Sequence, residues 1–252
     1  MAKKKKKRKK GFGLVVIEWI LGLAIIIGIG IAFCYFFCKV KDVSVEGTKL
    51  YSTVEIIDYI LDDELCDNAV YAVVSNHFFP KDGLEFISDF EVKMTSLNTI
   101  VIVCNEKPIL GYMENNPSEY IYFNYDGRIA QISSHYVDGY IKVEGVMCEE
   151  PMEGDLLDIG DRQVGYLVAL IKAVEKYDLI PNVISYNSRG DVTLIYDSYN
   201  IVLGDVEYLE EKMERITHIL PSIEQMEGTL HVENYSPNST DIVFEKKMEE
   251  AE

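Results

Sequence analysis

Residues 19–38 read WILGLAIIIGIGIAFCYFFC, twenty consecutive positions without a charged side chain. At about 1.5 Å of rise per helical residue, such a run covers the roughly 30 Å hydrocarbon layer of a bilayer. Within that layer a single segment satisfies its own backbone hydrogen bonds only as a helix. The apolar character extends back to Leu14, so the sequence predicts a transmembrane helix over residues 14–38.

The flanks of this segment predict its orientation. Residues 1–13 form a basic tail with eight lysines and arginines, which the positive-inside rule places in the cytoplasm. Glu18 then falls at headgroup level beside Trp19, a residue typical of the interfacial belt; a functional carboxylate inside the membrane is the alternative. A cleaved signal peptide has the same order of charge and apolar residues, but this run is too long and its end, Cys34 to Cys38, lacks the small residues of a cleavage site. We therefore expect a retained single-pass anchor of type II.

The charge changes sign after the anchor. The basic tail holds eight of the 24 basic residues and Glu18 is the one acidic residue before position 39, so residues 39–252 carry 16 basic and 41 acidic side chains, a net charge of −25. Such a surface repels nucleic acid and favours solubility or a cationic partner. Cys66, Cys104 and Cys148 form no CxxC pair, so we expect buried free thiols, with a single bridge among them as the alternative.

Residues 39–108 are expected to form one domain of three strands and two helices. Ser52 and Glu55 have the spacing of a capping box, which opens the first helix, and Pro80 stops the second. The simplest packing is an antiparallel sheet with both helices on one face. The expected elements, in chain order, are a strand over 40–47, helices from 52 and over 68–79, and strands over 84–94 and 99–103.

Residues 109–246 are expected to form a second domain richer in strands, followed by a flexible acidic tail over 247–252. Asp126-Gly127 predicts a hairpin, because a tight turn needs a residue with positive φ. Asp161 is expected to cap an amphipathic helix. The expected helices cover 161–177 and 206–220, and the expected strands cover 120–125, 128–133, 183–186, 192–196, 200–203, 229–233 and 241–245.

The sequence contains no short motif of an enzyme. HExxH, GxSxG, SxxK and a glycine-rich phosphate loop are all missing, and the four histidines lie in four different parts of the chain. The acidic run at residues 62–64 is expected to be a solvated helix end, and Asp155, Asp158 and Asp161 lack the ligand rhythm of a calcium loop. We therefore expect no catalytic residue, metal, cofactor or small-molecule substrate. An extracellular membrane-anchored enzyme with scattered catalytic residues is the rival class.

Two stretches outside the anchor carry a family pattern. Residues 43–47 (VSVEG) followed by Ser52 combine a strand ending in glycine with a capped helix, and residues 98–108 read NTIVIVCNEKP. Together with the basic tail and single span, they resemble the POTRA domain and the strand motif p-N-T-l-x-I-x-V-x-E-r-x-P of the FtsQ/DivIB family. Residues 122–128 resemble the family's next hairpin, with Asn124 and Tyr125 in the stretch where an aspartate is usual and Asp126 kept before Gly127. The likeness continues to about residue 246.

The resemblance implies an α+β fold with one N-terminal transmembrane helix, a POTRA domain (β-α-α-β-β) over 39–108 and a mixed α/β "beta" domain over 109–246. It implies a non-enzymatic scaffold of the divisome in the bacterial cell membrane at the division septum. The implied partners are FtsB/DivIC-type and FtsL-type proteins, with a septal penicillin-binding protein as a further candidate. An exposed POTRA face around Val43, Val45 and Tyr51 is a candidate contact for other membrane partners. A POTRA protein of export or sporulation is the alternative.

The expected partner-binding site is the last strand. A mixed sheet whose last strand lies at an edge offers unpaired N–H and C=O groups that a partner strand can join. A charge at Ile242 or Phe244 is expected to abolish partner capture without unfolding the domain; a covered closing strand is the alternative. The residues assigned to this edge are Asp241, Ile242, Val243 and Phe244, with Tyr235 flanking.

Overall fold

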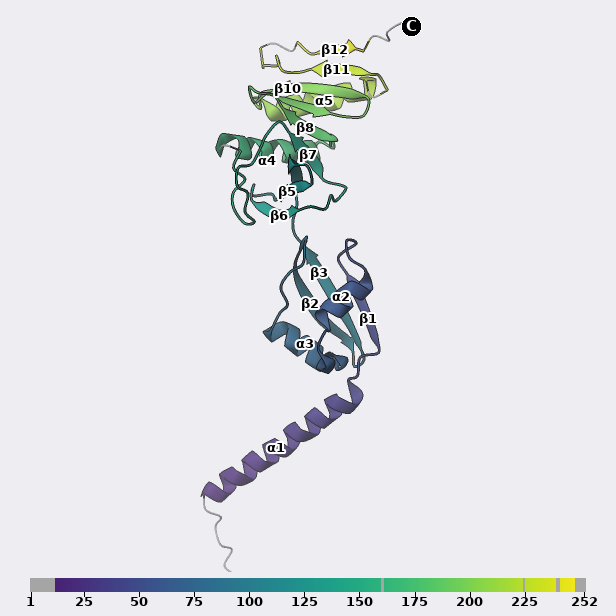
Figure 1. Ribbon diagram of the computed structural model, residues 1–252, viewed down its shortest axis with the longest axis vertical. Helices are drawn as coiled ribbons and strands as arrows, with labels where there is room; N and C mark the ends of the chain where they lie inside the picture. Colours follow the sequence, from purple (N-terminus) through teal and green to yellow (C-terminus); the bar gives the residue numbers. More distant parts are fainter. Residues whose placement is uncertain (1–11, 160, 224, 239–240, 248–252) are drawn as a thin grey trace, which may run out of the picture. The chain divides into compact units, whose positions relative to one another are not determined.

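The computed structural model describes residues 12–159, 161–223, 225–238 and 241–247. Most of the expected basic tail and all but the first residue of the expected acidic tail lie outside these ranges. The chain divides into two compact units, one ending at Glu106 and the other beginning at Lys107. As expected, the architecture is mixed α+β with one N-terminal apolar helix (Figure 1).

Helix α1 covers Phe12–Phe37, 26 residues. Its stretch Val16–Phe37 is the one helical segment among the described residues that is long and apolar enough to cross a membrane. Large apolar side chains such as Trp19 and Ile29 are exposed all around it. A helix that is apolar on every face needs an apolar surrounding, which fits a membrane anchor.

The rest of the first unit is a three-stranded sheet with two helices. The strand order is β1-β3-β2, with β1 parallel to β3 and β2 antiparallel to β3, so the expected wholly antiparallel sheet is wrong. The most apolar strand, with Ile100, Ile102 and Cys104 buried, takes the centre, where both of its edges are paired. The elements are β1 Asp42–Glu46, α2 Thr53–Ile60, a 3-10 turn η1 Glu64–Asp67, α3 Ala69–Phe78, β2 Ile87–Ser96 and β3 Thr99–Glu106.

Local chemistry explains how these helices begin and where the sheet ends. The predicted capping box is confirmed: the Ser52 hydroxyl accepts from the Glu55 N–H, and Glu55 Oε2 accepts from the Ser52 N–H at 2.8 Å. Ala69 and Ala72 are the buried residues of α3. The Asn76 side chain accepts from the Val92 N–H at 3.1 Å and so covers part of the outer edge of β2.

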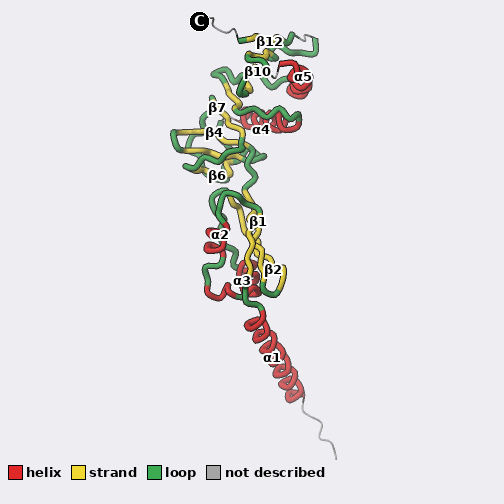
Figure 2. Tube along the Cα trace, turned by 90° about the vertical axis from the view of Figure 1, so that its right-hand side faces the viewer, coloured by secondary structure: helices red, strands yellow, loops and turns green. Residues whose placement is uncertain are grey.

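The second unit is a nine-stranded sheet in the order β12-β11-β10-β9-β8-β7-β4-β5-β6. Helices α4 and α5 lie on the same side of it (Figure 2). The expected meander of three short strands is confirmed as β8, β9 and β10, whereas β4 and β7 were not expected. The elements are β4 Gly111–Asn116, β5 Glu119–Phe123, β6 Ile129–Ser133, β7 Ile141–Glu144, α4 Asp161–Lys176, β8 Val183–Tyr186, β9 Val192–Ile195, β10 Tyr199–Gly204, α5 Leu209–Ile223, β11 Gly228–His231 and β12 Val243–Lys246.

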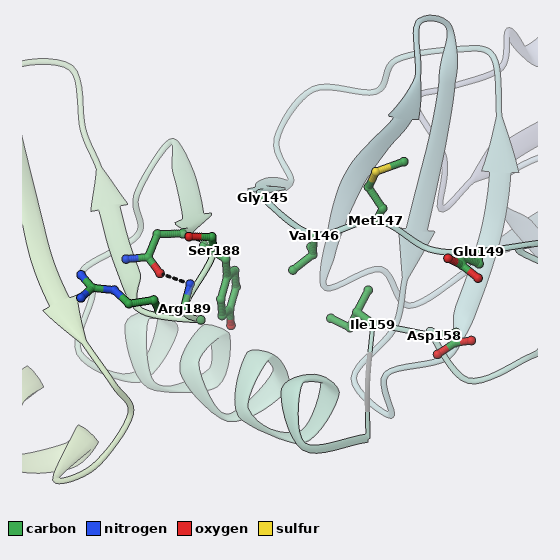
Figure 3. A pocket seen from close by; sticks show the side chains of 11 residues that line it. Gly145, Val146, Met147, Glu149, Asp158, Ile159, Ser188 and Arg189 are labelled. Atoms are coloured by element: carbon green, nitrogen blue, oxygen red, sulfur yellow. Dashed lines mark hydrogen bonds between the residues drawn. The ribbon is translucent and has the colours of Figure 1, made fainter.

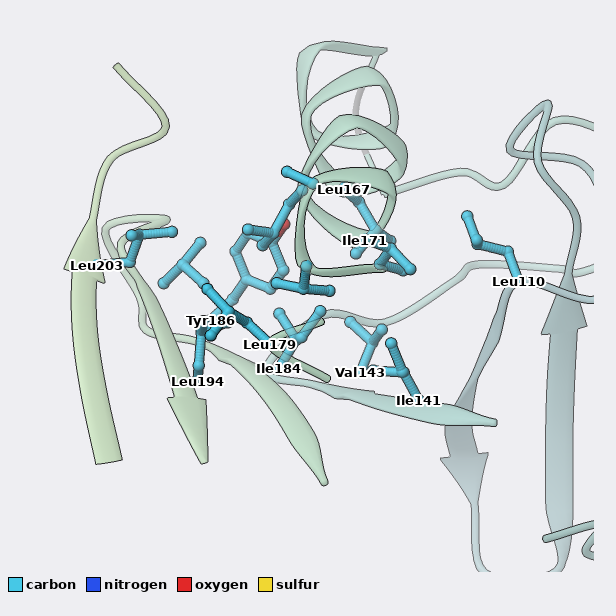
Figure 4. Packing of buried hydrophobic residues seen from close by; sticks show 14 of the residues in the cluster. Leu110, Ile141, Val143, Leu167, Ile171, Leu179, Ile184, Tyr186, Leu194 and Leu203 are labelled. Atoms are coloured by element: carbon cyan, nitrogen blue, oxygen red, sulfur yellow. The ribbon is translucent and has the colours of Figure 1, made fainter. Parts of the chain in front are cut away.

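The core of this unit lies between the helices and the sheet. Leu167 and Ile171 of α4 point toward Ile184 and Val143 on the strands, and all four are buried (Figure 4). Removing such side chains from water, at about 25 cal/mol per Å² of apolar area, is the main stabilising term. The five cysteines are free thiols, and Cys66, Cys104 and Cys148 are buried, as expected. The capping role expected of Asp161 falls on a side chain outside the described part of the chain.

Candidate functional site

The last strand, β12, ends the nine-stranded sheet. It pairs with β11 on one side, and no described strand lies on its other side. The strand begins at Val243, two residues later than expected, so Asp241 and Ile242 precede it. β12 starts late because its partner strand, β11, ends at His231. The chain then turns, with the Tyr235 N–H donating to Val232 O. The four residues Val243–Lys246 on their unpaired side are called the β12 edge below.

The register decides which backbone groups face outward. The Lys247 N–H donates to Glu227 O at 3.0 Å, which makes these two residues a hydrogen-bonded pair. Hydrogen-bonded and non-hydrogen-bonded pairs alternate along an antiparallel ladder. Glu245 and Val243 therefore bond to β11, whereas the N–H and C=O groups of Phe244 and Lys246 point away from it. The β12 edge thus presents donors and acceptors at every second residue.

The side chains of the edge lie on two different faces. Tyr235, Ile242 and Phe244 are half-buried against the core of the unit, whereas Val243 is 59% exposed. A β-carbon added at Gly228 would lie 2.8 Å from Phe244 Cζ, so the ring lies closely against this glycine. A charge at Ile242 or Phe244 would enter the core. The expectation that such a change leaves the fold intact stays a prediction, and the exposed Val243 is the better position for probing the edge.

Carboxylates surround the exposed face of the edge. His231 Nδ1 lies 3.0 Å from Glu233 Oε1, and His231 Nε2 lies 3.5 Å from Glu245 Oε2. Lys247 is paired with Glu227 at 3.2 Å. A partner strand that brings a basic side chain to this face would meet Glu245, whose side chain is exposed.

A buried lysine supports the strand layout next to the edge. Lys212 of α5 is fully buried, and its Nζ donates to Leu203 O at 3.0 Å, Asp205 O at 2.9 Å and Asp205 Oδ1 at 3.1 Å. These bonds fasten α5 to the end of β10, which pairs with β11. Lys212 was not predicted as a buried residue; the signal available was its place beside Met213 on the apolar face of a helix.

The second predicted surface, around Val43, Val45 and Tyr51, is not an exposed face. All three side chains are half-buried against the core of the first unit, and the Tyr51 hydroxyl donates to Glu85 O at 3.1 Å. Alternation along β1 turns the valines inward, and Asp42 and Glu46 are among the residues turned outward. What β1 does offer is its backbone, because it is an edge strand of its sheet.

A polar pocket of the second unit lies at the carboxyl ends of β7 and β8 and has a volume of about 460 Å³. Arg189 lies on one side, paired with Asp191, and Glu149 and Asp158 lie on the other (Figure 3). Burial raises the pKa of Tyr186, which also lines the pocket, to about 12. Within the described residues no group of three or more His, Cys, Asp or Glu side chains could hold a metal ion.

Comparison with known proteins gives a distant similarity. No family model matches the chain. The cell division protein DivIB of Clostridium tetani (strain Massachusetts / E88) is 25% identical over 147 residues, which make up 57% of this chain and 55% of that protein. The chain thus spans about half the length of this curated relative. The similarity is thus to a cell division protein, and helix α1 of this chain is long and apolar enough to cross a membrane.

Proposed function

We propose that this chain is a membrane-anchored, non-enzymatic scaffold of the bacterial divisome, of the FtsQ/DivIB type. In this proposal the basic tail is cytoplasmic, residues 39–108 are a POTRA domain and residues 109–246 a beta domain outside the membrane. The similarity to DivIB and the single apolar helix support it. The observed order β1-α2-α3-β2-β3 supports the POTRA assignment.

The open β12 edge is the observation that carries the binding role. A partner segment would add as a strand, because Phe244 and Lys246 direct their backbone groups outward. Alternate side chains of that segment would extend the apolar face formed by Ile242 and Phe244, and the others would lie beside Glu245. The expected partner is therefore a short segment with apolar residues at every second position and a basic residue between them. FtsB/DivIC-type or FtsL-type proteins would supply it.

A pull-down from cells tests this assignment. Val243→Glu adds a second carboxylate to the exposed face of the edge and should reduce recovery of small single-pass partners. Val54→Glu is the matched control, because Val54 is 65% exposed on α2 in the other unit. Equal recovery with both variants would remove the β12 edge from the proposal.

Imaging of a fluorescent fusion in dividing cells tests the process. Enrichment at mid-cell supports a divisome scaffold. Uniform signal around the membrane, together with capture of unrelated partners, would instead support a POTRA protein of export or sporulation. Turnover by the purified chain would support an enzyme and contradict the scaffold.

The backbone of β1 is proposed as a second contact for membrane partners. Its outer edge is unpaired among the described strands, and Ser44 lies at its centre with an exposed side chain. Ser44→Lys places a charge on this edge and should weaken a POTRA-dependent partner while leaving β12-dependent capture unchanged. Loss of both partners, or of neither, would contradict a separate site on β1.

A further inference from the structure

Helix α3 is apolar on two faces. One face, with Ala69 and Ala72, is buried in the core of the first unit. The other face has Val70, Val74 and Phe78 at a spacing of four residues, and Val74 and Phe78 are exposed. We call Val70, Val74 and Phe78, with Phe79 directly after the helix, the α3 outer face. A helix with two apolar faces is normally covered on both.

The start of α3 is tied to the end of α1. The Asn68 Oδ1 caps α3 by accepting from the N–H groups of Val70 and Tyr71, and its Nδ2 donates to Cys34 O of α1 at 2.8 Å. The Ala69 N–H donates to Cys38 O at 2.8 Å. One asparagine therefore satisfies free N–H groups at the beginning of α3 and adds a second bond to a carbonyl near the end of α1, since Cys34 O also accepts from the Cys38 N–H.

A second asparagine strengthens this junction. The Asn98 Nδ2, in the turn between β2 and β3, donates to Phe37 O at 3.0 Å and to Lys39 O at 2.6 Å. The last carbonyls of α1 are thus bound by side chains from two separate segments of the folded unit. Such bonds hold α3 at the level where α1 leaves the membrane.

The length of α1 places that level in the membrane interface. Its 26 residues measure about 39 Å, which exceeds a hydrocarbon layer of roughly 30 Å. The excess is taken up by tilt or by the last turns entering the interface. Those turns carry the exposed aromatic residues Tyr35, Phe36 and Phe37, the composition of an aromatic belt.

An apolar cleft joins the two helices at this point. It has a volume of about 570 Å³ and is lined by Ile27, Ile31 and Tyr35 of α1 together with Leu65, Val70 and Val74. The α1 residues of the cleft belong to the apolar anchor. The α3 residues on the other side of the cleft therefore meet the same apolar surrounding as the anchor does. Phe78 and Phe79, 69% and 80% exposed, continue this surface beyond the cleft.

We propose that the α3 outer face rests in the bilayer, at the boundary of headgroups and acyl chains on the side where α1 ends. This inference depends on α1 being a membrane anchor and is independent of any divisome partner. The attraction is apolar rather than electrostatic, because residues 39–252 carry a net charge of −25 and repel anionic lipid. The membrane would thus hold the first unit by two contacts, the helix α1 and the face of α3.

Tryptophan fluorescence of the full chain in phosphatidylcholine vesicles tests the proposal. The chain has a single tryptophan, Trp19, so Trp19→Phe gives a silent background for Phe78→Trp. Val54→Trp is the matched control, since Val54 is similarly exposed. It lies on α2, which follows the end of β1 that is farther along the chain from α1. Circular dichroism checks that both variants keep the secondary structure.

Vesicles with brominated acyl chains then report depth. The Phe78→Trp emission should be blue-shifted and quenched at least about twofold more than that of Val54→Trp, because an interfacial helix buries its apolar face roughly 5–10 Å into the boundary. Equal, solvent-like emission from both variants would overturn the proposal. Blue-shifted emission that brominated lipid leaves unquenched would also overturn it, because the face would then be covered by protein. Adding anionic lipid should not increase the quenching.

Discussion

A proline placed at one of two neighbouring positions of β12 distinguishes strand addition from other modes of binding. The N–H of Lys246 points to the open side, so Lys246→Pro removes an outward donor without breaking a bond to β11. The N–H of Glu245 points to β11, so Glu245→Pro breaks the ladder that holds β12. The two variants make similar chemical changes on opposite sides of one strand.

The size of the effect follows from the bonds involved. Lys246→Pro removes one backbone donor of the β12 edge. The proline ring also prevents the partner strand from approaching the adjacent residue of β12. One to two net hydrogen bonds at about 0.5–1.5 kcal/mol each give a loss of about 0.5–3 kcal/mol, or roughly 2- to 150-fold in Kd. Stability should change little, because Lys246 is exposed and its N–H has no partner in β11.

The assay is titration of the detergent-solubilised full chain with a labelled partner peptide, beside a thermal melt of the same sample. Lys246→Ala is the control for loss of the lysine side chain and should bind as the wild type does. Glu245→Pro should lower Tm as well as affinity. If Lys246→Pro binds as tightly as Lys246→Ala, the partner does not join the backbone of β12, and the proposed mode of binding is refuted.

Four further changes test individual structural arguments. Gly228→Ala should cost about 1–3 kcal/mol of stability in a urea titration, because its β-carbon would collide with the backbone oxygen of Glu245 and lie 2.8 Å from Phe244 Cζ; an unchanged midpoint would contradict this packing. Lys212→Met should cost about 2–4 kcal/mol, since three acceptors lose their donor; a stabilised chain would show that the ion is dispensable. Ser52→Ala should cost about 1 kcal/mol and speed hydrogen exchange in α2; unchanged exchange would contradict the capping role. Burial raises the pKa of Tyr186 to about 12, above its unfolded value near 10. The contribution of its neutral form to stability is therefore complete below pH 10 and is lost as the pH rises to about 12. Phenolate absorbance that titrates wholly near pH 10 would contradict this.

Elements with a local signal were predictable. The capping box at Ser52 and the hairpin around Gly127 each depend on a few adjacent residues. In the hairpin the resemblance looked weakest at Asn124, yet this side chain accepts from the N–H groups of Asp126 and Arg128 at 2.9 and 3.0 Å. Asparagine and aspartate side chains can both accept such bonds in a turn, so Asn124 supports this hairpin.

Features that depend on distant parts of the chain were not predictable. The parallel pairing of β1 with β3 joins strands that are far apart in the sequence, and no local pattern encodes it. Strand β7 has only four residues, and β4 ends in the polar run 114–116, so neither gave a clear alternation. The inward direction of Phe244 depends on the register with β11. A shift of one residue would have turned it outward.

An open edge strand invites pairing with a second copy of the same chain, yet this edge carries features that disfavour it. The strand is four residues long, which limits the number of bonds a second copy could make. Glu245 and Lys246 put charges on its two faces, and Glu233 and Glu245 flank His231. Two copies would bring these carboxylates together on surfaces that are already strongly acidic, whereas a partner with a basic residue would neutralise them. In the proposed function, the same charges that discourage self-pairing would favour a foreign, basic strand.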